Sequence, residues 1–482
     1  MKLSDLVDLE PSHLQSGGGT KVTGVTADSR QVKPGYVFVA VPGTKADGSR
    51  FINDAVAKGA AAVVVAEDAE IPGGLKIPVL LTAEPRRALA MIAARYFGAQ
   101  PSTVVAVTGT SGKTSVAEFT RQIFARCGRS SASLGTIGVI KPSGAIYGSL
   151  TTPDPVTLHE TVAGLVREGV THLAMEASSH GLDQFRLDGV RLTAGAFTNI
   201  GRDHLDYHPT AGHYFEAKMR LFSELLQTGQ PVVINTDGAG ANDVIAVARE
   251  RGLKVLTVGT KGEALRLDRV ERDGFAQRLT LTCEGREHLV LLPLVGTYQV
   301  ENALVAAGLA LAVGENAGAV IQAIEKLSGV TGRLEIVGEK NGGLAVVDYA
   351  HKPEALIAAL EACRPFVSGK LICVFGCGGD RDRGKRPIMG GIAAERADVV
   401  IVTDDNPRTE VAASIRAEIL ANAPGAREIG DRAEAIGTAA AMMGPGDVVL
   451  VAGKGHETGQ IVGKDVLPFS DHGVLRAAMG LA

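Results

Sequence analysis

A glycine-rich turn near residue 110 has the residue types needed to bind a phosphate. The apolar run from Val104 to Val107 leads into Gly109-Thr110-Ser111-Gly112-Lys113-Thr114-Ser115, and a helical pattern follows. Glycines at such a turn let backbone N–H groups converge on an anion, and the next helix adds the positive end of its dipole. Lys113 supplies positive charge for a phosphate, and the hydroxyl of Thr114 or Ser115 is a ligand for Mg²⁺. The segment predicts a phosphate loop.

The loop is shorter than the general pattern G-x-x-x-x-G-K-[ST], which would place a glycine where Val107 stands. An ordinary strand-to-helix connection that contains Gly-Lys-Thr by chance is the alternative. Because a phosphate loop indicates only that a nucleotide binds, other segments must show how the nucleotide is used.

Carboxylates and imidazoles follow two further apolar runs. Glu176 comes after the run at 172–175, and Asp203 and His204 come after the run at 194–198. In a doubly wound parallel sheet, ligands bind at the carboxyl ends of the strands. Mg²⁺ prefers oxygen donors there, and imidazole also binds divalent metals. Each residue taken alone also fits a solvated loop, but their joint placement favours a metal site.

Four later apolar runs end in charged loops that are rich in glycine or proline. These loops are Asp348–Pro353, Gly378–Arg386, Thr403–Arg408 and Gly453–Glu457. If the four strands are parallel, the loops lie on one edge of one sheet. Their mixture of acidic and basic residues favours a zwitterionic ligand with ammonium and carboxylate groups over simple solvated turns.

Three candidate positions have an ordinary structural explanation as well. Lys218, in an aromatic-rich helical stretch, indicates by itself a surface lysine. The segment Tyr298–Asn302 opens an apolar helix that runs to about Val313, and the spacing of Asn302 favours a helix cap over a contact with a base or ribose. Ser29 and the loop at 43–48 fit either a clamp for a small ligand or ordinary surface turns.

The elements that must position these residues alternate between strand and helix. Apolar strands are predicted at 104–108, 172–175, 194–198, 232–235 and 254–258, an Ala-rich helix over 80–100, and strands with hairpins over 268–295. The alternation predicts an α/β fold with mostly parallel, doubly wound sheets. The length of 482 residues suggests about three domains. Pro101 marks the first boundary, and the pattern restarts at Gly332.

Composition excludes several classes of protein. A net charge of −4 gives no bulk attraction to nucleic acid or to an anionic membrane. The 5 cysteines are scattered without a C-x-x-C pair, which disfavours a disulfide framework or zinc and favours reduced thiols. No N-terminal signal core and no apolar run of ~18 residues is present. We therefore expect a cytoplasmic protein.

Taken together, the motifs resemble the Mur ligases, a family that adds amino acids to the UDP-linked peptide precursor of the bacterial cell wall. The segments that support the resemblance are Gly109–Thr114, Thr151–Asp154, Met175–Leu182, Asn199–His208, Tyr214–Lys218, Asp348–Pro353 and Asp405–Arg408. The resemblance implies a small N-terminal α/β domain for the UDP-sugar (1–100), a central doubly wound phosphate-loop ATPase domain (101–331) and a C-terminal Rossmann-like domain for the amino acid (332–482).

The resemblance also implies roles for individual residues. ATP would contact Gly109, Thr110, Ser111, Gly112, Lys113, Thr114, Ser115, Asn302, Arg333 and His351. The UDP-muramoyl substrate would contact Ser29, Thr44, Lys45, Ala46, Thr151, Thr152, Ser178, Gln184 and Arg186. Ser111 stands where many family members have Asn.

The implied catalytic residues are Lys113, Glu176, His204 and Lys218, and the implied Mg²⁺ ligands are Thr114, Glu176, His204 and Lys218. Lys218 matches the lysine that CO₂ converts into N6-carboxylysine in these enzymes. A carbamate turns the cation into an anion that supports Mg²⁺, whereas an ammonium would repel the metal.

Within the family, the pocket residues match members that add meso-diaminopimelate. These residues are Arg381, Asp405, Asn406, Pro407, Arg408, Gly453 and Glu457. A guanidinium at Arg408 can bind the distal carboxylate that diaminopimelate has and lysine lacks. The implied reaction joins this amino acid to the D-glutamyl γ-carboxylate of UDP-N-acetylmuramoyl-L-alanyl-D-glutamate through an acyl phosphate, with consumption of ATP.

The expected partners are therefore small molecules, without nucleic acid or membrane, and we expect a monomer. Three alternatives remain: the same reaction with L-lysine, a folylpolyglutamate synthase-like ligase, and a nucleotide-dependent switch without turnover. The second would lack the region from Asp28 to Asp47 and the segment Asp405–Arg408, and the third would lack part of the metal-binding set.

Overall fold

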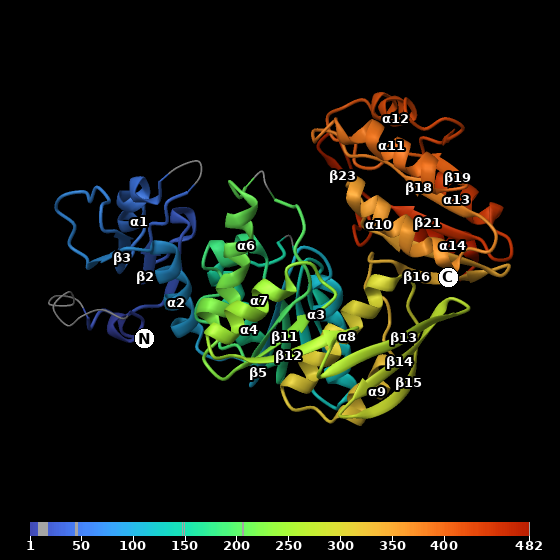
Figure 1. Ribbon diagram of the computed structural model, residues 1–482. Helices are drawn as coiled ribbons and strands as arrows, with labels where there is room; N and C mark the ends of the chain where they lie inside the picture. Colours follow the sequence, from blue (N-terminus) through green and yellow to red (C-terminus); the bar gives the residue numbers. More distant parts are fainter. Residues whose placement is uncertain (8–17, 44–46, 147, 149, 205–206, 482) are drawn as a thin grey trace. The chain divides into compact units, whose positions relative to one another are not determined.

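The computed structural model describes residues 1–7, 18–43, 47–146, 148, 150–204 and 207–481 (Figure 1). The expected substrate residues Thr44, Lys45 and Ala46 lie outside the described residues. Contacts divide the chain into two compact units. The first comprises Met1–Val258 with Gly308–Asn316, and the second comprises Gly259–Ala307 with Ala317–Ala482. The domain boundaries near residues 100 and 331 stay a prediction.

A parallel sheet opens the first unit, in the order β1 (Gly24–Thr26), β2 (Tyr36–Val39), β3 (Ala62–Ala66) and β4 (Val79–Thr82). Its α-helices are α1 (Ile52–Ala57) and α2 (Pro85–Phe97), and α2 lies beside the sheet (Figure 1). The helix predicted over 80–100 is shorter than expected. Apolar residues before it pair with β3 as β4, and Glu84 and Pro85 then start the helix as its cap and first residue.

The phosphate-loop strand, β5 (Thr103–Thr108), lies between β9 (His172–Glu176) and β10 (Ala194–Phe197) in a second sheet of the first unit. Parallel strands continue on both sides as β6 (Ser131–Gly135), β11 (Pro231–Asn235) and β12 (Lys254–Gly259). An antiparallel extension follows β6 as β7 (Gly138–Lys141) and β8 (Gly144–Ile146). The five strands predicted in this region are confirmed, and their carboxyl ends share one edge.

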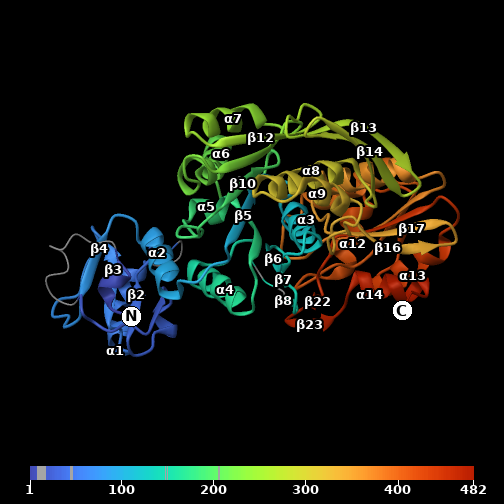
Figure 2. The same cartoon turned by 90° about the horizontal axis from the view of Figure 1, so that it is seen from below.

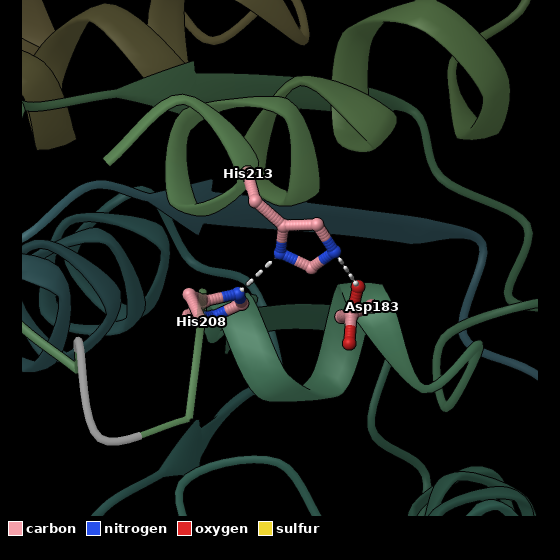
Figure 3. Close-up of side chains that lie close together, drawn as sticks. All are labelled: Asp183, His208 and His213. Carbon is pink, nitrogen blue, oxygen red and sulfur yellow. Dashed lines mark hydrogen bonds and ion pairs between the residues drawn. The ribbon is translucent and has the colours of Figure 1, made fainter. Parts of the chain in front are cut away.

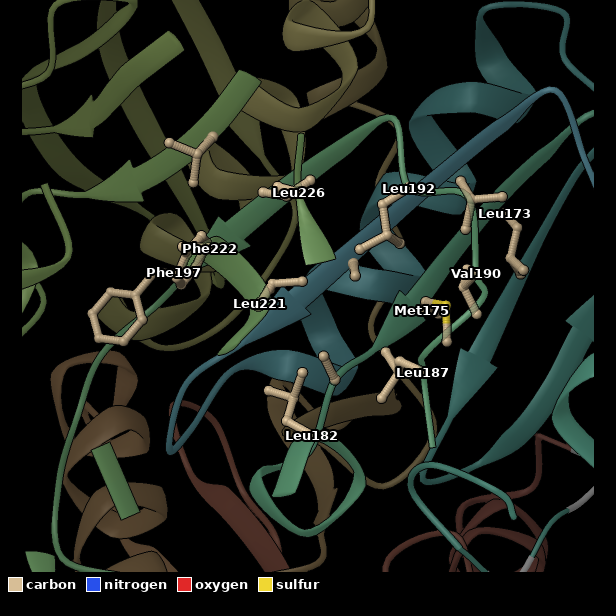
Figure 4. Packing of buried hydrophobic residues seen from close by; sticks show 14 of the residues in the cluster. Leu173, Met175, Leu182, Leu187, Val190, Leu192, Phe197, Leu221, Phe222 and Leu226 are labelled. Atoms are coloured by element: carbon tan, nitrogen blue, oxygen red, sulfur yellow. The ribbon is translucent and has the colours of Figure 1, made fainter. Parts of the chain in front are cut away.

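Helices cover both faces of this second sheet. They are α3 (Lys113–Arg126), α4 (Pro155–Arg167), α5 (Ser179–Asp183), α6 (Ala211–Arg220), the π-helical η5 (Leu221–Leu225) and α7 (Ala241–Glu250). Helix α3 packs on β5, β6 and β9 (Figure 2). Apolar side chains of β9, such as Leu173 and Met175, pack in a buried cluster with Leu221 and Phe222 (Figure 4). This core fixes the strands whose ends hold the candidate site.

The second unit begins with three antiparallel strands, β13 (Leu265–Asp273), β14 (Ala276–Cys283) and β15 (Arg286–Leu292), as predicted for 268–295. Helices α8 (Thr297–Ala312) and α9 (Ala317–Ile324) follow. The helix cap predicted at Asn302 is wrong. The helix itself begins at Thr297, one residue before the predicted start at Tyr298. Asn302 therefore lies inside the helix, where its amide donates to Gln299 Oε1 at 3.1 Å.

A further sheet of the second unit has the order β16-β17-β21-β18-β19-β20, with only β16 antiparallel to its neighbour. These strands are β16 (Glu335–Lys340), β17 (Gly343–Asp348), β18 (Leu371–Phe375), β19 (Val399–Val402), β20 (Arg427–Glu428) and β21 (Val448–Ala452). The four predicted strands, β17, β18, β19 and β21, are parallel, so their charged loops share one edge.

Alternate residues of β17 separate two helical layers. Leu344 and Val346 pack with α10 (Pro353–Cys363), α11 (Lys385–Arg396) and α12 (Ala412–Leu420). Ala345 and Val347 pack with α13 (Arg432–Met442) and α14 (Asp471–Met479). A hairpin, β22 (Gly459–Val462) with β23 (Asp465–Pro468), follows β21. The expected α/β class with mostly parallel sheets is confirmed.

All five cysteines are free thiols, as the sequence predicted. Within the described ranges, no helix is both long enough and apolar enough to cross a membrane.

We expect Leu173→Ala to destabilise the first unit by about 2–5 kcal/mol, because the substitution empties a fully buried position in β9. Unfolding followed by circular dichroism in denaturant would measure the loss. Leu81→Ala, at a position that is 43% exposed on β4 of the same unit, is the matched control. Equal losses in the two variants would contradict the assignment of this core.

Candidate active site

The predicted phosphate loop lies between β5 and α3, as such a loop requires. Gly109 has φ +149° and Gly112, the N-cap of α3, has φ +89°. A Cβ on Gly109 would lie 1.9 Å from Thr198 Oγ1, so only glycine fits there. Helix α3 then starts at Lys113, with its N-terminal N–H groups and dipole at the loop. The expected loop residues, 109–115, therefore lie together.

The end of β10 braces this loop. The carbonyl of Asn199 accepts from Thr110 N at 2.8 Å, and its side-chain oxygen accepts from Ser111 N at 3.1 Å. The hydroxyl of Thr198 donates to the carbonyl of Ser111 at 2.6 Å. The shape of the loop thus depends on the neighbouring strand as well as on its own glycines.

Two lysines meet at the carbonyl oxygen of Gly109. Lys113 Nζ donates to it at 2.9 Å, and Lys218 Nζ, from α6, donates to it at 2.7 Å. Lys218 is only 1% exposed and lies 4.4 Å above the ring centroid of Tyr214, so the surface position indicated by its sequence context alone is wrong. Burial, together with the charge of Lys113, holds the pKa of Lys218 well below its usual range. This environment favours a neutral amine.

Glu176 ends β9 and is 1% exposed. Its carboxylate accepts from Thr136 N at 2.7 Å and from Thr136 Oγ1 at 3.3 Å. The hydroxyls of Thr136 and Thr151 lie 3.0 Å apart. A Cβ on Gly135 would lie 2.1 Å from Glu176 Oε1, so the end of β6 leaves room for this carboxylate.

Thr152 joins most of the residues expected at the UDP-muramoyl substrate. Its hydroxyl accepts from Ser178 Oγ at 3.0 Å, and its carbonyl accepts from Arg186 Nη1 at 2.6 Å. Arg186 Nη2 donates in turn to Gln184 Oε1 at 2.7 Å. Ser29 lies instead on the short helix after β1, where its carbonyl accepts from Lys58 Nζ. The structure thus gathers the part of the set that follows β6 and β9.

His204 follows β10 in the left-handed region, at φ +52°. Its N–H donates to Asp203 Oδ1 at 2.8 Å, and its ring centroid lies 4.8 Å from that of His180. The side chain is 41% exposed. His204 is therefore held by local contacts while its imidazole stays accessible.

Three residues that the sequence analysis missed form a chain of contacts next to His204 (Figure 3). The Nδ1 atoms of His208 and His213 lie 2.9 Å apart, and His213 Nε2 lies 3.7 Å from Asp183 Oδ1. Asp183 Oδ2 accepts from Tyr207 Oη at 2.7 Å. Desolvation lowers the pKa of His208 to about 4. His213 turns one nitrogen to each neighbour, so the three side chains form a relay. One ligand atom of each lies within 4.8 Å of the others, which is a spacing that a metal ion could bridge.

In the second unit, the three residues expected at the nucleotide share one network. Gln299 links Asn302 to the backbone of Arg333, because its amide donates to the Arg333 carbonyl at 3.0 Å. The Arg333 guanidinium lies 5.2 Å above the ring of Tyr349, and His351 Nδ1 lies 2.8 Å from the Tyr349 carbonyl. Tyr349 is the centre of this group.

His456 belongs to the same group and was missed, although its charged loop was singled out. Its ring centroid lies 5.0 Å from that of Tyr349. His456 Nδ1 and Arg333 Nε are buried without a hydrogen-bond partner in the part of the chain that the structure describes. Buried polar atoms normally have partners, so these two fit a site that a polar ligand completes.

The expected amino-acid pocket contains a buried lysine that the sequence analysis also missed. Lys454 Nζ donates to Asn406 Oδ1 and to Glu457 Oε2, both at 2.9 Å, and is fully buried. The Asn406 amide donates to the same Glu457 oxygen at 2.9 Å. Among the expected pocket residues only Arg381, in the loop between β18 and α11, is exposed.

Arg408 stands at the end of the β19 loop with φ +52°. Its Nη1 donates to the carbonyl of Gly379 at 2.8 Å. Asp405 and Pro407, from the same loop, are buried. Across from them, a Cβ on Gly453 would lie 2.8 Å from Asp405 Oδ2, so Gly453 lets the β21 loop approach. The pocket therefore presents a guanidinium together with carboxylates.

Asp348, at the end of β17, is a buried carboxyl beside the nucleotide group. It accepts from Leu334 N at 2.7 Å and Ala350 N at 2.8 Å, yet desolvation raises its pKa to about 6 against the opposing charge of Arg333. In the unfolded chain the pKa of this carboxyl is about 4. Between about pH 4 and about pH 6, Asp348 therefore keeps its proton in the folded chain and has lost it in the unfolded chain.

We therefore expect the free energy of unfolding contributed by Asp348 to fall as pH rises from about 4 to about 6. Denaturant unfolding of the unchanged chain and of Asp348→Asn across this range would show it, because the variant removes that part of the slope. Asp465→Asn, at an exposed position on β23, is the control. Parallel curves for the unchanged chain and Asp348→Asn would contradict the raised pKa.

Three family models match the chain in succession. They describe the catalytic domain of the Mur ligase family (residues 21–98), the Mur ligase middle domain (107–310) and the glutamate ligase domain of Mur ligases (332–455).

Individual proteins match over most of the chain. A UDP-N-acetylmuramoyl-L-alanyl-D-glutamate–2,6-diaminopimelate ligase of Bradyrhizobium diazoefficiens is 57% identical, covering 99% of each chain. A solved structure of an enzyme with that name has a TM-score of 0.75 and 32% identity, covering 100% of this chain and 99% of its own. A folylpolyglutamate synthase structure from Thermotoga maritima shares the fold, with a TM-score of 0.61 and 18% identity over 76% of this chain and 89% of its own.

Proposed function

Because this chain belongs to the Mur ligase family, we propose that it adds meso-diaminopimelate to UDP-N-acetylmuramoyl-L-alanyl-D-glutamate, with conversion of ATP to ADP and phosphate. The new amide bond joins the amino group to the γ-carboxylate of the D-glutamyl residue. The name and full-length coverage of the relative from Bradyrhizobium diazoefficiens favour this acceptor over that of a folylpolyglutamate synthase.

The pocket around Arg408 is the observation that supports the acceptor best. Glu457 and Asp405 offer carboxylate oxygens to an ammonium group, and the Arg408 guanidinium suits a second carboxylate. Diaminopimelate has two ammonium and two carboxylate groups, whereas lysine lacks the distal carboxylate. The mixture of charges thus matches the larger zwitterion.

The reaction proceeds in two steps. An oxygen of the D-glutamyl γ-carboxylate attacks the γ-phosphorus of ATP, and the bond from that phosphorus to the oxygen of the β-phosphate breaks. The products of this step are ADP and an acyl phosphate. The amine then attacks the acyl carbon, phosphate departs, and the nitrogen loses a proton. Lys113 and the N-terminus of α3 lie where they can neutralise the phosphate oxygens.

The residues expected to hold Mg²⁺ fit a hard cation. Thr114 offers a hydroxyl, Glu176 a buried carboxylate and His204 an accessible imidazole. Lys218 fits this set only as a carbamate, because an ammonium would repel the cation. When bound, Mg²⁺ supplies positive charge beside the phosphate oxygens.

Substrate binding completes the proposal. Asn302, Arg333 and His351 contact the nucleotide in the second unit, where Arg333 Nε and His456 Nδ1 await polar partners. Thr151, Thr152, Ser178, Gln184 and Arg186, with Ser29, bind the UDP-muramoyl dipeptide. Thr44, Lys45 and Ala46 lie outside the described residues, and we include them in this set on the family resemblance alone. We also propose a cytoplasmic monomer with the three domains set out above.

The first test is phosphate release from ATP with the UDP-muramoyl dipeptide, comparing meso-diaminopimelate, L-lysine and no amino acid. We expect release and a matching gain in product mass only with diaminopimelate. Turnover with L-lysine but not with diaminopimelate would still show a ligase, but it would contradict the role of Arg408. Binding of ATP without turnover on any acceptor would favour a switch.

The environment of Lys218 suits carbamate formation. A neutral amine can attack the carbon of CO₂ and release a proton, and burial keeps this amine neutral. An ordinary exposed lysine is protonated at neutral pH and reacts poorly. The depressed pKa therefore supports Lys218 as the modified residue.

We expect removal of CO₂ to lower the ligase rate and bicarbonate to restore it. Lys218→Arg should lower kcat by about 10²-fold, since arginine removes the anionic metal ligand. Nuclear magnetic resonance with isotope-labelled bicarbonate should show a carbamate signal that Lys218→Arg loses and Lys254→Arg, at an exposed position, retains. A signal retained in Lys218→Arg would refute the assignment.

A further inference from the structure

Two loops of the second unit touch beneath the amino-acid pocket. One follows β18 and contains Gly379, and the other follows β19 and contains Pro407 and Arg408. Gly379 N donates to the Asn406 carbonyl at 2.9 Å, and a Cβ on Gly379 would lie 1.9 Å from the Pro407 oxygen. The backbones are thus in direct contact.

The side chain of Asp380 fastens the first loop to the second. Its Oδ2 accepts from Thr409 N at 3.1 Å, and its Oδ1 accepts from Thr409 Oγ1 at 2.7 Å. These bonds hold the pKa of Asp380 below its ordinary value. Asp380 directly precedes Arg381 and Thr409 directly follows Arg408, so this carboxylate joins the two loops at positions next to the two arginines.

Asp380 and Arg408 both have φ +52°, in the left-handed region that residues other than glycine rarely adopt. Such a conformation persists only where surrounding contacts hold it. The Asp380–Thr409 contact spans these two positions. Other bonds hold each backbone as well: Arg408 N donates to the Ile461 carbonyl at 3.1 Å, and Asp380 N donates to Glu410. Loss of the Asp380–Thr409 contact would therefore loosen the link between the two loops and shift the arginine side chains without unfolding either loop.

An ion pair between the buried Arg386 and the half-buried Glu410 supports this contact. Glu410 Oε1 accepts from Asp380 N at 2.6 Å and from Arg386 Nη2 at 2.8 Å, and Glu410 Oε2 accepts from Arg386 Nη1 at 3.0 Å. Arg386 is fully buried and also donates to the Gly378 carbonyl at 3.2 Å. A two-pronged pair of this kind fixes orientation as well as distance.

We propose that Asp380 is a positioning residue that holds Arg381 and Arg408 as a pair for the carboxylates of the acceptor amino acid, with Glu410 and Arg386 as its support. This inference rests on the proposed function of the pocket. Asp380 itself acts through the two arginines, and its contribution is to acceptor binding rather than to either chemical step.

Asp380→Ala and Asp380→Asn form a matched pair for the test. Alanine removes both contacts with Thr409, whereas asparagine can still accept from Thr409 N and donate to Thr409 Oγ1. Steady-state assays with the unchanged full chain and each variant would measure kcat and the KM values for diaminopimelate, ATP and the UDP-muramoyl dipeptide. Glu361→Gln, which alters an exposed ion pair with Arg396, is the control.

We expect Asp380→Ala to raise the KM for diaminopimelate by about tenfold or more, with kcat and the other two KM values unchanged. Asp380→Asn should recover most of the loss, and Glu361→Gln should behave like the unchanged chain. Thermal unfolding midpoints should agree among the unchanged chain, Asp380→Asn and Glu361→Gln. Asp380→Ala should lower its midpoint only slightly, because the contacts that it removes lie on an exposed loop.

An unchanged KM for diaminopimelate in Asp380→Ala would overturn the inference, and so would a matching loss in all parameters with a lower unfolding midpoint. Assays of the unchanged chain show whether the role of Asp380 alone has failed or whether the proposed function has failed as well. If it turns over diaminopimelate, only the role of Asp380 has failed, whereas no turnover and no calorimetric binding of diaminopimelate would overturn both.

Discussion

The parallel pairing of β5 with β9 and β10 is the constraint on which the candidate site of the first unit depends. It brings three chain segments to one edge of one sheet: the phosphate loop, the segment from Glu176 and the segment from Asn199. A shift of one residue in the register of β9 against β5 would turn buried side chains such as Leu173 and Met175 to the opposite face. The hydrophobic core therefore fixes the register, and the register fixes which polar groups meet.

Burial of charge is the second recurring feature. Lys218 and Lys454 are both buried, but their surroundings differ. Lys454 contacts the carboxylate of Glu457 and the amide oxygen of Asn406, so its charge is balanced and its role is to orient those acceptors. Lys218 contacts only a backbone carbonyl and an aromatic ring in the bonds described above, next to the like charge of Lys113. The surroundings of Lys218 stabilise a neutral amine.

Local sequence was sufficient for the elements and for the loops at their ends, because strand periodicity and glycine turns are local properties. The strands that precede Gly109, Glu176 and Asn406 all appear where the pattern predicted them. Local sequence did not predict which charged side chains are buried. Lys218 looked like a surface lysine, and nothing near Lys454 in the chain indicated that Asn406 would cover it.

The error at Asn302 has the same origin as these omissions. The predicted start of this helix, at Tyr298, lies one residue from the observed start at Thr297. Spacing alone did not show that the Asn302 amide contacts Gln299 inside the helix instead of capping it. Likewise, the relay from Asp183 through His213 to His208 joins two segments separated by β10, so neither segment reveals it. Roles that depend on contacts between distant segments required either the structure or the family resemblance.

Backbone strain follows the candidate sites closely. Among the described residues, the non-glycine positions with positive φ are Phe185, His204, Glu284, Leu334, Asn341, Asp380 and Arg408. Glu284 and Asn341 lie in tight hairpin turns, where such angles are common. All the others are, or directly adjoin, residues expected to bind substrate or metal. Each left-handed residue costs about 1–2 kcal/mol, and the surrounding contacts must offset that cost. Strain concentrated in this way is expected of positions selected for where their side chains point rather than for stability.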